Sequence, residues 1–302
     1  MNTTTHEETK RLEVGVHRIP MAEYLADPCP EPSLSSSMLN RLVTRSPMHA
    51  YHEHPRLGNG SRFDSNKADM GTVAHDILLG GEGKICIIDP EDFAGAKGAV
   101  PKGWTNNAIR EARDEARANG LTPILKGAEL AAKAMAAKAR KFLADSEIAG
   151  VLDDGEAELT IVAQVNGVYL RARPDWFNPV KKIMLHYKTT EASAEPCRFI
   201  AGVMRGMGYG TAVAFYQKVW ESFSAENFDW THVILVQEQD APYACSLIAL
   251  DPVKLSIEMQ AVDYGIMTWA QCLKSGKWPG YPGLIHYAAA SSWELAAAEQ
   301  RL

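Results

Sequence analysis

Apolar runs separated by turn residues mark short strands in the second half of the chain. Residues 168–172 and 183–187 are apolar, aromatic or β-branched in near alternation, and Pro174 breaks the segment between them. The pattern predicts a hairpin that carries Asp175 near the end of one strand and Lys188 at the end of the next.

A second hairpin is predicted immediately before this one. Asn166-Gly167 is a strong two-residue turn signal, and it joins strands predicted at 155–164 and 165–172. Glu158 lies on the first of these strands, where a plain strand-start residue and a secondary metal ligand are equal alternatives. Further strands are predicted at 85–89, 230–237 and 245–249.

Helical periodicity accounts for most of the remaining chain. Ser35 or Ser36 is a good N-cap for a helix with an apolar stripe, and Ser46-Pro47 ends that helix and starts another. A helix N-terminus with Ser hydroxyls can also hold a phosphate, although capping ranks first. Other helices are predicted at 70–80, 107–118, 126–145, 196–207, 208–220 and 252–273, with loops at 55–69 and 94–107 and an extended piece at 14–19.

Composition narrows the class of protein. The chain has 302 residues, of which 46% are apolar and 23% charged, as in ordinary globular proteins. No apolar run reaches about 18 residues and the N-terminus has no apolar signal core, so we expect a cytoplasmic protein without a membrane span. Five scattered cysteines without a CxxC pair indicate reduced thiols.

The net charge of −6 argues against broad attraction to nucleic acid, but a nuclease can line its groove with local basic residues.

Asp175 and Lys188 at the ends of paired strands suit metal-assisted phosphodiester hydrolysis. A carboxylate holds a hard cation, and the cation polarises a phosphoryl oxygen and lowers the pKa of a bound water. The Lys can orient that water or stabilise the charge that develops. Arg171 and Arg173 alternate on one face beside Asp175 and could contact a phosphate. Taken alone, Asp and Lys are also common in solvated hairpins.

The order of motifs resembles that of a known nuclease superfamily. Arg173-Pro-Asp175, a hairpin and Lys188-Thr-Thr190 resemble the core of the PD-(D/E)XK nucleases, most closely the RecB-like and RecE-like exonucleases of phages and prophages. Gly71-Thr-x-x-His75-x-x-Leu-Leu resembles their first motif, although a lone His among apolar residues is more often a core residue. The similarity extends over about residues 33–285.

The resemblance implies the fold and its boundaries. We expect an α/β protein with a restriction-endonuclease-like core, in which a mixed central sheet is flanked by helices. A single nuclease domain would span 33–290, with a helical insertion at about 107–145. An irregular arm at 1–32 would precede it, and a tail at 291–302 would follow.

The resemblance also implies a site, cofactors and partners. Lys188 and Asp175 would be catalytic, with Mg²⁺ or Mn²⁺ as cofactor and no iron–sulfur cluster. The partners implied are linear duplex DNA, further copies of the chain and a RecT-like single-strand annealing protein, in the cytoplasm of a bacterial host if the chain is phage-encoded. The metal ligands would be His75, Asp175, His186 and Glu158, and the DNA contacts would be Arg171, Arg173, Tyr216, Ser35 and Ser37.

Two positions depart from the family pattern. His186 stands where the pattern has an acidic residue two before the Lys, and Ala212 stands where it has Gln. An imidazole suits Mn²⁺ better than Mg²⁺, which prefers oxygen ligands. Two functions therefore stay open, a metal-dependent exonuclease and a nuclease-fold protein that binds DNA or a partner with little catalysis. An α/β domain unrelated to nucleic acids is disfavoured by the presence of His75, Asp175, Lys188 and Tyr216 in one chain.

Overall fold

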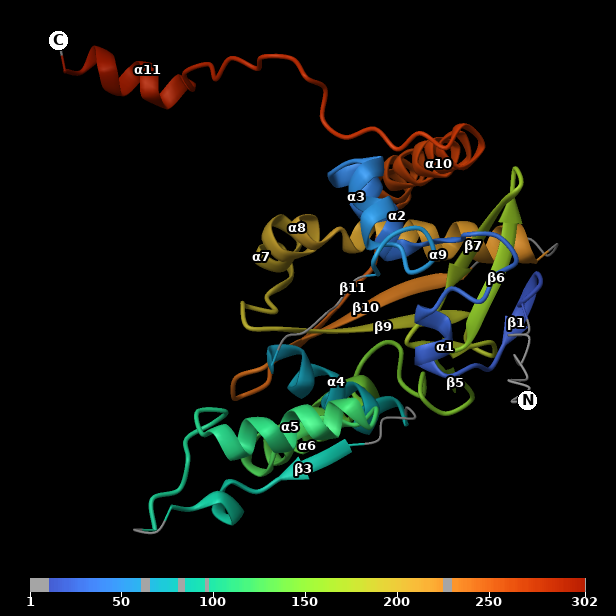
Figure 1. Ribbon diagram of the computed structural model, residues 1–302. Helices are drawn as coiled ribbons and strands as arrows, with labels where there is room; N and C mark the ends of the chain where they lie inside the picture. Colours follow the sequence, from blue (N-terminus) through green and yellow to red (C-terminus); the bar gives the residue numbers. More distant parts are fainter. Residues whose placement is uncertain (1–10, 61–65, 81–84, 96–97, 225–229, 302) are drawn as a thin grey trace, which may run out of the picture.

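The computed structural model describes residues 11–60, 66–80, 85–95, 98–224 and 230–301 (Figure 1). Its strands are β1 (Gly15–His17), β2 (Leu34–Ser35), β3 (Ile85–Ile88), β4 (Thr122–Leu125), β5 (Glu156–Ala157), β6 (Thr160–Val165), β7 (Val168–Ala172), β8 (Trp176–Asn178), β9 (Ile183–Thr190), β10 (Thr231–Glu238) and β11 (Cys245–Ile248). Its helices are α1 (Met21–Leu25), α2 (Ser36–Thr44), α3 (Pro47–Glu53), α4 (Asn66–Leu79), α5 (Asn107–Ala118), α6 (Lys126–Ala144), α7 (Pro196–Phe199), α8 (Arg205–Met207), α9 (Tyr209–Phe223), α10 (Pro252–Ser275) and α11 (Ser292–Glu299), with a 3₁₀ turn η1 (Pro90–Phe93) and a π-helical turn η2 (Ile200–Met204).

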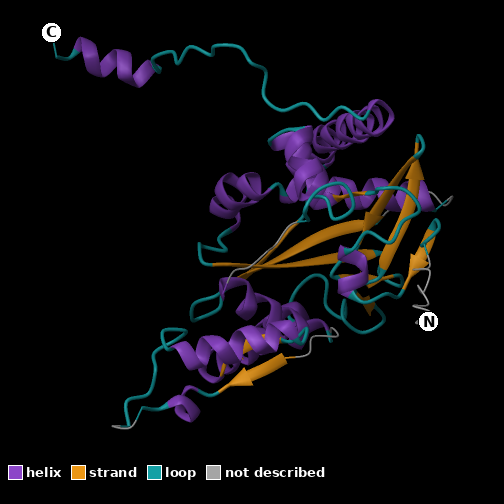
Figure 2. Ribbon diagram, viewed as in Figure 1, coloured by secondary structure: helices purple, strands orange, loops and turns teal. Residues whose placement is uncertain are grey.

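Two mixed sheets hold most of the strands. In the described residues, one sheet has the order β1-β6-β7-β2 and the other the order β11-β10-β9-β8-β5, while β3 and β4 form a separate parallel pair. Strands β9 and β10 are parallel, and β8 and β11 flank them in antiparallel orientation. Figure 2 shows helices on both sides of the strands of the second sheet. The predicted mixed α/β fold is confirmed, although the strands divide between sheets instead of forming one.

Alternate residues of β9 point to the two helical layers. Leu185 and Tyr187 pack in a buried cluster with α4 and α6, whereas Met184 packs in another with α9 and α10. Because successive side chains of a strand face opposite sides, β9 is buried on both faces. The strand therefore lies at the centre of the fold, and its last residues carry the site described below.

The predicted hairpin between 168–172 and 183–187 is wrong. Strand β7 pairs with β6 and β2, and β9 instead pairs with the short strand β8. Pro174 lies between β7 and β8, and a proline has no N–H to donate to a strand ladder. The chain therefore leaves one sheet at Ala172 and enters the other at Trp176, so Asp175 begins the second hairpin and does not end the first.

Other local predictions are confirmed closely. Asn166 and Gly167 both have positive φ, as the two-residue turn between β6 and β7 requires. The helices predicted at 107–118 and 126–145 are α5 and α6. Residues 61–65 of the predicted loop at 55–69 lie outside the described residues, and α4 begins at Asn66. In the described ranges, no helix combines the length and apolarity needed to cross a bilayer.

The segment predicted as an irregular N-terminal arm is folded where it is described. Residues 1–10 lie outside the described residues, but β1 pairs with β6, and α1 precedes a buried ionic cluster around Asp27. The Asp27 carboxylate accepts hydrogen bonds from Ser33 N–H (3.0 Å) and Ser33 Oγ (2.6 Å), and Arg171 NH1 lies 3.0 Å from it. His54 Nε2 is 3.2 Å away. This cluster ties the arm to β7.

We expect Asp27→Asn to lower the free energy of unfolding by about 3–5 kcal/mol, because it leaves the buried Arg171 charge without its carboxylate. Burial alone would raise the pKa of Asp27, but hydrogen bonds from His54 and Ser33 and the charge of Arg171 hold it below its ordinary 3.8. The stabilisation is therefore complete above that pH and fades as the pH falls through the folded pKa.

Urea denaturation of wild type and Asp27→Asn between pH 3 and pH 7 measures this effect. The matched control is Asp145→Asn, which removes an exposed ion pair with Lys141 and should cost about 0–1 kcal/mol. If Asp27→Asn costs no more than this control at neutral pH, the cluster does not hold the arm.

Candidate active site

Three predicted residues meet where β8, β9 and α4 come together. Asp175 directly precedes β8, Lys188 lies on β9, and His75 lies on α4. Trp176 pairs with Leu185, so the same register sets Asp175 opposite His186. Lys188 Nζ is 3.0 Å from Asp175 Oδ2, and His75 Nε2 is 3.7 Å from Asp175 Oδ1. The fold therefore brings together groups that are more than 100 positions apart in sequence.

The Asp175 carboxylate is fixed as an anion between two cationic groups. Its Oδ2 accepts hydrogen bonds from Tyr187 N–H (2.8 Å) and Lys188 Nζ (3.0 Å). Burial alone would raise the pKa of Asp175, but Lys188 and His75 together hold it far below its ordinary value. Burial lowers the pKa of Lys188, and the charge of Asp175 more than reverses this, so the pKa is raised. Both groups are charged at neutral pH.

His75 lies between two sets of carboxylates. Its Nδ1 is 3.5 Å from Asp76 Oδ1 and 4.0 Å from Glu158 Oε1, while its Nε2 faces Asp175. Burial would lower the pKa of His75, but hydrogen bonds to Asp175 and Asp76 outweigh it and raise the pKa to about 9. Asp76 was not among the predicted site residues, although it directly follows His75 in the sequence.

A close contact between α4 and β9 sets the position of His75. A Cβ atom on Gly71 would lie 2.6 Å from Thr189 Oγ1, so no larger residue fits there. Gln239 Nε2 donates to the same Thr189 oxygen at 3.0 Å, which prevents the hydroxyl from moving aside freely. One turn along the helix, His75 then faces Asp175. The prediction that small residues let this helix pack closely agrees with this geometry.

The two predicted DNA-contacting arginines point into the protein. Arg171 is 3% exposed and binds Asp27 and Ser33. Arg173 is 7% exposed, and it donates to Glu158 Oε2 (2.9 Å) and Thr160 Oγ1 (2.9 Å). Neither side chain is placed to reach a phosphate. Arg173 instead holds Glu158 beside His75.

His186 is held away from solvent by two aromatic neighbours. It is 3% exposed, its Nε2 lies 3.1 Å from His232 Nδ1, and its ring stacks on Tyr216 with a centroid separation of 4.8 Å. Burial lowers the pKa of His186 to about 4, so the ring is neutral at pH 7. Sequence reasoning did not find His232, because its contact with His186 depends on the parallel pairing of β9 and β10.

The remaining predicted residues have structural contacts. Ser35 is the N-cap of α2, and its Oγ accepts from Met38 N–H and lies 3.1 Å from Ser37 Oγ. Ser37 is exposed, as a phosphate contact would require. Tyr216, on α9, is half-buried, and burial raises its pKa to about 12. It therefore presents a neutral hydroxyl and an aromatic face to the site.

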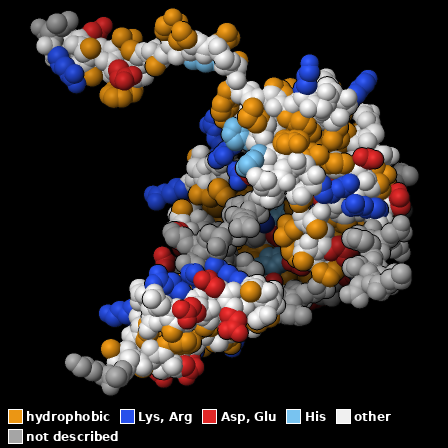
Figure 3. All heavy atoms as spheres, viewed as in Figure 1, with side chains coloured by type: hydrophobic (Ala, Val, Ile, Leu, Met, Phe, Trp, Pro, Cys, Tyr) orange, Lys and Arg blue, Asp and Glu red, His pale blue; other side chains and the backbone are white. Residues whose placement is uncertain are grey.

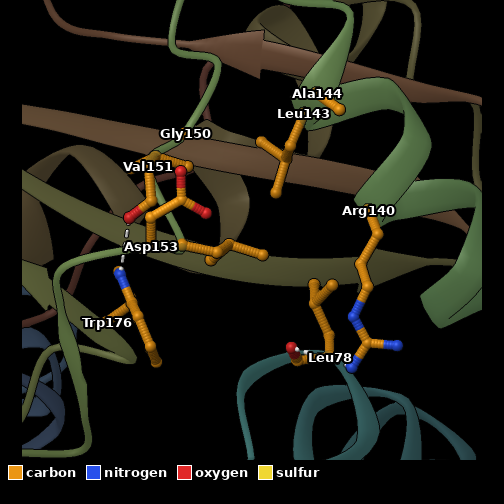
Figure 4. Close-up of a pocket in the computed structure, with 9 residues that line it drawn as sticks. Leu78, Arg140, Leu143, Ala144, Gly150, Val151, Asp153 and Trp176 are labelled. Atoms are coloured by element: carbon orange, nitrogen blue, oxygen red, sulfur yellow. Dashed lines mark hydrogen bonds between the residues drawn. The ribbon is translucent and has the colours of Figure 1, made fainter.

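One cavity in the described residues lies apart from these groups. It has a volume of about 310 Å³ and is lined by Leu78, Arg140, Leu143, Ala144, Gly150, Val151, Leu152, Asp153 and Trp176 (Figure 4). The Arg140 guanidinium points to the end of α4, where it donates to Leu78 O at 3.2 Å. Trp176 Nε1 donates to Val151 O at 2.8 Å. The cavity lies beside the C-terminal end of α4 and the first residue of β8. Asp175, Lys188 and His75 do not line it.

The part of the chain that contains Asp175 and Lys188 matches a known protein family. A model described as a PDDEXK-like domain of unknown function (DUF3799) matches residues 120–291, more than half of the chain. The chain belongs to this family. The predicted PD-(D/E)XK superfamily is thereby confirmed, and the match includes Asp175, His186 and Lys188. His75 lies outside the matched residues, and its place in the site rests on the geometry alone.

Solved structures agree on the fold. A candidate exonuclease from Eubacterium rectale superposes with a TM-score of 0.55 and 11% identity, over 93% of this chain and 99% of that chain. At this identity the likeness shows the fold alone. A second structure, SSO0001, aligns over 68% of this chain and 87% of that chain, with 12% identity and a TM-score of 0.25, which is too low to support an argument. No curated protein matches the chain.

PDDEXK nucleases use divalent metal ions, and the donor atoms here fit one. Ligands about 2.1–2.2 Å from an ion stand roughly 3 Å apart when adjacent and roughly 4.3 Å apart when opposite. The 3.7 Å between His75 Nε2 and Asp175 Oδ1 lies between these limits. In the described residues, His75, Asp76 and Glu158 also offer donor atoms that all lie within 4.8 Å of one another. Neither Asp175 nor His186 is part of that group.

We expect Gly71→Ala to displace α4 from β9, because the added methyl group meets Thr189. The free energy of unfolding should fall by about 1–3 kcal/mol, the usual cost of overpacking, and Mn²⁺ affinity should fall as His75 moves from Asp175. The control is Gly127→Ala on α6, where a Cβ meets nothing within 4 Å and the change should be no more than about 1 kcal/mol. Denaturation and calorimetric titration with Mn²⁺ measure both effects. Equal results for the two variants would show that the contact does not position His75.

Proposed function

We propose that this protein is a metal-dependent deoxyribonuclease that hydrolyses phosphodiester bonds of linear duplex DNA. The observation that carries the proposal is the Asp175 carboxylate, which binds Lys188 through one oxygen and faces His75 with the other. One oxygen of Asp175 could thus bind a cation together with His75. The other oxygen holds the charged ammonium group of Lys188 beside it. The family assignment supports the same class of reaction, because the matched family is PDDEXK-like and PDDEXK nucleases use divalent metal ions.

Each side chain has a distinct role in this mechanism. Asp175 Oδ1 and, after loss of its proton, His75 Nε2 would hold the divalent ion, which when bound lowers the pKa of a water and polarises the phosphoryl group. Asp76 and Glu158 face the other nitrogen of His75 and fix the orientation of its ring, as carboxylates do behind histidine ligands. Lys188, kept charged by Asp175, stabilises the negative charge that develops on the phosphoryl oxygens and orients the water.

The surroundings of the site are consistent with a DNA path. In Figure 3 the molecule is hollowed between the α4–α6 lobe and the rest, histidine side chains are visible in the hollow, and Lys and Arg side chains lie along the rim of that lobe. A local basic rim can hold the DNA backbone although the whole chain carries a charge of −6. Ser37 and Tyr216 are the predicted DNA contacts that we retain, because neither is fully buried.

Finer parts of the proposal rest on the resemblance of motifs. They are exonucleolytic action, a role in phage-type recombination beside a RecT-like annealing protein, and a cytoplasmic location. Mn²⁺ is the metal that we favour, because an imidazole is a better ligand for it than for Mg²⁺.

A second function is supported by one observation. His186 replaces the second carboxylate of the motif, and its contacts with His232 and Tyr216 hold it as a neutral, buried ring. A site with one acidic ligand fewer attracts a hard cation less strongly. In this alternative, the protein binds DNA or a partner through the same surface and cleaves slowly or not at all.

We expect Lys188→Ala to reduce digestion of end-labelled linear duplex DNA by about 100-fold or more, because it removes the charge that stabilises the transition state. The assay is run with Mg²⁺ and separately with Mn²⁺. Lys141→Ala, which changes an exposed ion pair on α6, is the control and should digest DNA as wild type does. Digestion that persists in Lys188→Ala would point to a contaminating nuclease or to a different site.

We expect His186→Asp to raise the affinity for Mg²⁺ by roughly tenfold or more, because it adds a negative charge opposite Asp175. His186→Asn removes the imidazole without adding charge and serves as the control. Calorimetric titration measures affinity, and the duplex assay measures cleavage. An inert wild type with an active His186→Asp variant would favour the binding function, whereas an active wild type favours the nuclease. An equal gain in His186→Asn would show that charge is not the cause.

A further inference from the structure

The last residues of the chain expose an unusual amount of apolar surface. We call residues 282–301 the C-terminal arm. Its side chains are exposed along almost its whole length, with exposed fractions of 80% for Ile285, 89% for Tyr287 and 71% for Trp293. Helix α11 within it has a complete capping box between Ser291 and Glu294. The arm therefore exposes apolar side chains before and within a capped helix, and exposed apolar surfaces of this kind mark interaction sites.

Contacts at the root of the arm fix the direction in which it leaves the body. The Trp278 ring packs against Tyr51 and Trp269, with centroid separations of 5.2 and 4.9 Å. The Tyr281 ring lies 5.6 Å from His49, and Met48 N–H donates to the carbonyl oxygen of Pro279 at 3.1 Å. These contacts bind the root to α3 and to Trp269 of α10. Figure 1 shows that the arm then runs away from the sheets and away from α10.

Helix α10 carries an apolar surface that complements the arm. Its inner face is buried at Val262, Ile266 and Trp269. Four more apolar residues lie on its outer side at spacings of four, seven and three residues, which places them in one stripe. We call these residues, Val253, Ile257, Tyr264 and Met267, the α10 stripe; their exposed fractions are 70%, 55%, 58% and 55%. In the described part of the chain, nothing covers this stripe.

We propose that the C-terminal arm of one chain packs on the α10 stripe of a second copy, so that two chains exchange arms. Both surfaces belong to the same chain, and a reciprocal exchange covers both of them in one closed dimer. Lys274 near the end of α10 offers a positive charge to Glu294 and Glu299 of the arm, whereas Lys254 is already paired with Glu258. The root contacts direct the arm outward, which favours a second copy over its own α10. This proposal is independent of the nuclease reaction.

Light scattering after size-exclusion chromatography of the full-length chain tests the proposal. Wild type should have the mass of a dimer. Trp293→Asp in the arm and Ile257→Asp in the stripe should each raise the dissociation constant of the dimer at least tenfold. Leu130→Asp is the control, because Leu130 is equally exposed at 61% but lies on α6. Far-ultraviolet circular dichroism confirms that each variant is folded.

Mixing the two variants distinguishes exchange between chains from folding back within one chain. A mixture of Trp293→Asp and Ile257→Asp retains one intact arm and one intact stripe, so it should associate more tightly than either variant alone. A monomeric wild type would overturn the proposal, whether its arm is free or packs on its own α10. A dimer that neither variant weakens, or a mixture no tighter than its components, would overturn it as well.

Discussion

Asp175 divides its two carboxylate oxygens between the sheet and helix α4. One oxygen accepts from the backbone of β9 and from Lys188, and the other faces His75. Unlike charges at these short distances, away from bulk water, interact strongly. The same carboxylate therefore joins β8 to β9, keeps Lys188 charged and sets the position at which His75 approaches. Any loss of this anion would affect both the packing of α4 and the chemistry of the site.

Two arginines next to the site add no positive charge to the surface. Arg171 and Arg173 are adjacent to Asp175 in sequence, but each is buried against a carboxylate, Asp27 in one case and Glu158 in the other. Their charges are neutralised inside the fold and add little to the field outside. Neither arginine therefore contributes positive charge to a surface that DNA could approach. The DNA contact proposed above would need exposed side chains instead.

Asp175 and Lys188 were singled out through the resemblance of their motif to a nuclease superfamily, and the local pattern around them did not pair their strands correctly. The turn at Asn166-Gly167 and the cap at Ser35 depend on neighbouring residues, so their geometry could be predicted from sequence. The change of sheet at Pro174 and the pairing of β9 with β10 depend on distant strands. For the same reason, the burial of Arg171 and the contact of His232 with His186 could not be predicted from spacing alone.

Without a bound cation, the fold accommodates the neutral ring of His186 better than it would accommodate a carboxylate at the same position. A carboxylate at this position would lie opposite Asp175 and, without a cation between them, two like charges would repel. The neutral ring of His186 avoids that repulsion and gains a hydrogen bond from or to His232 and a stacking contact with Tyr216. The substitution thus favours the metal-free fold at the expense of attraction for a cation. Stability without metal and affinity for metal are therefore opposed at this single position.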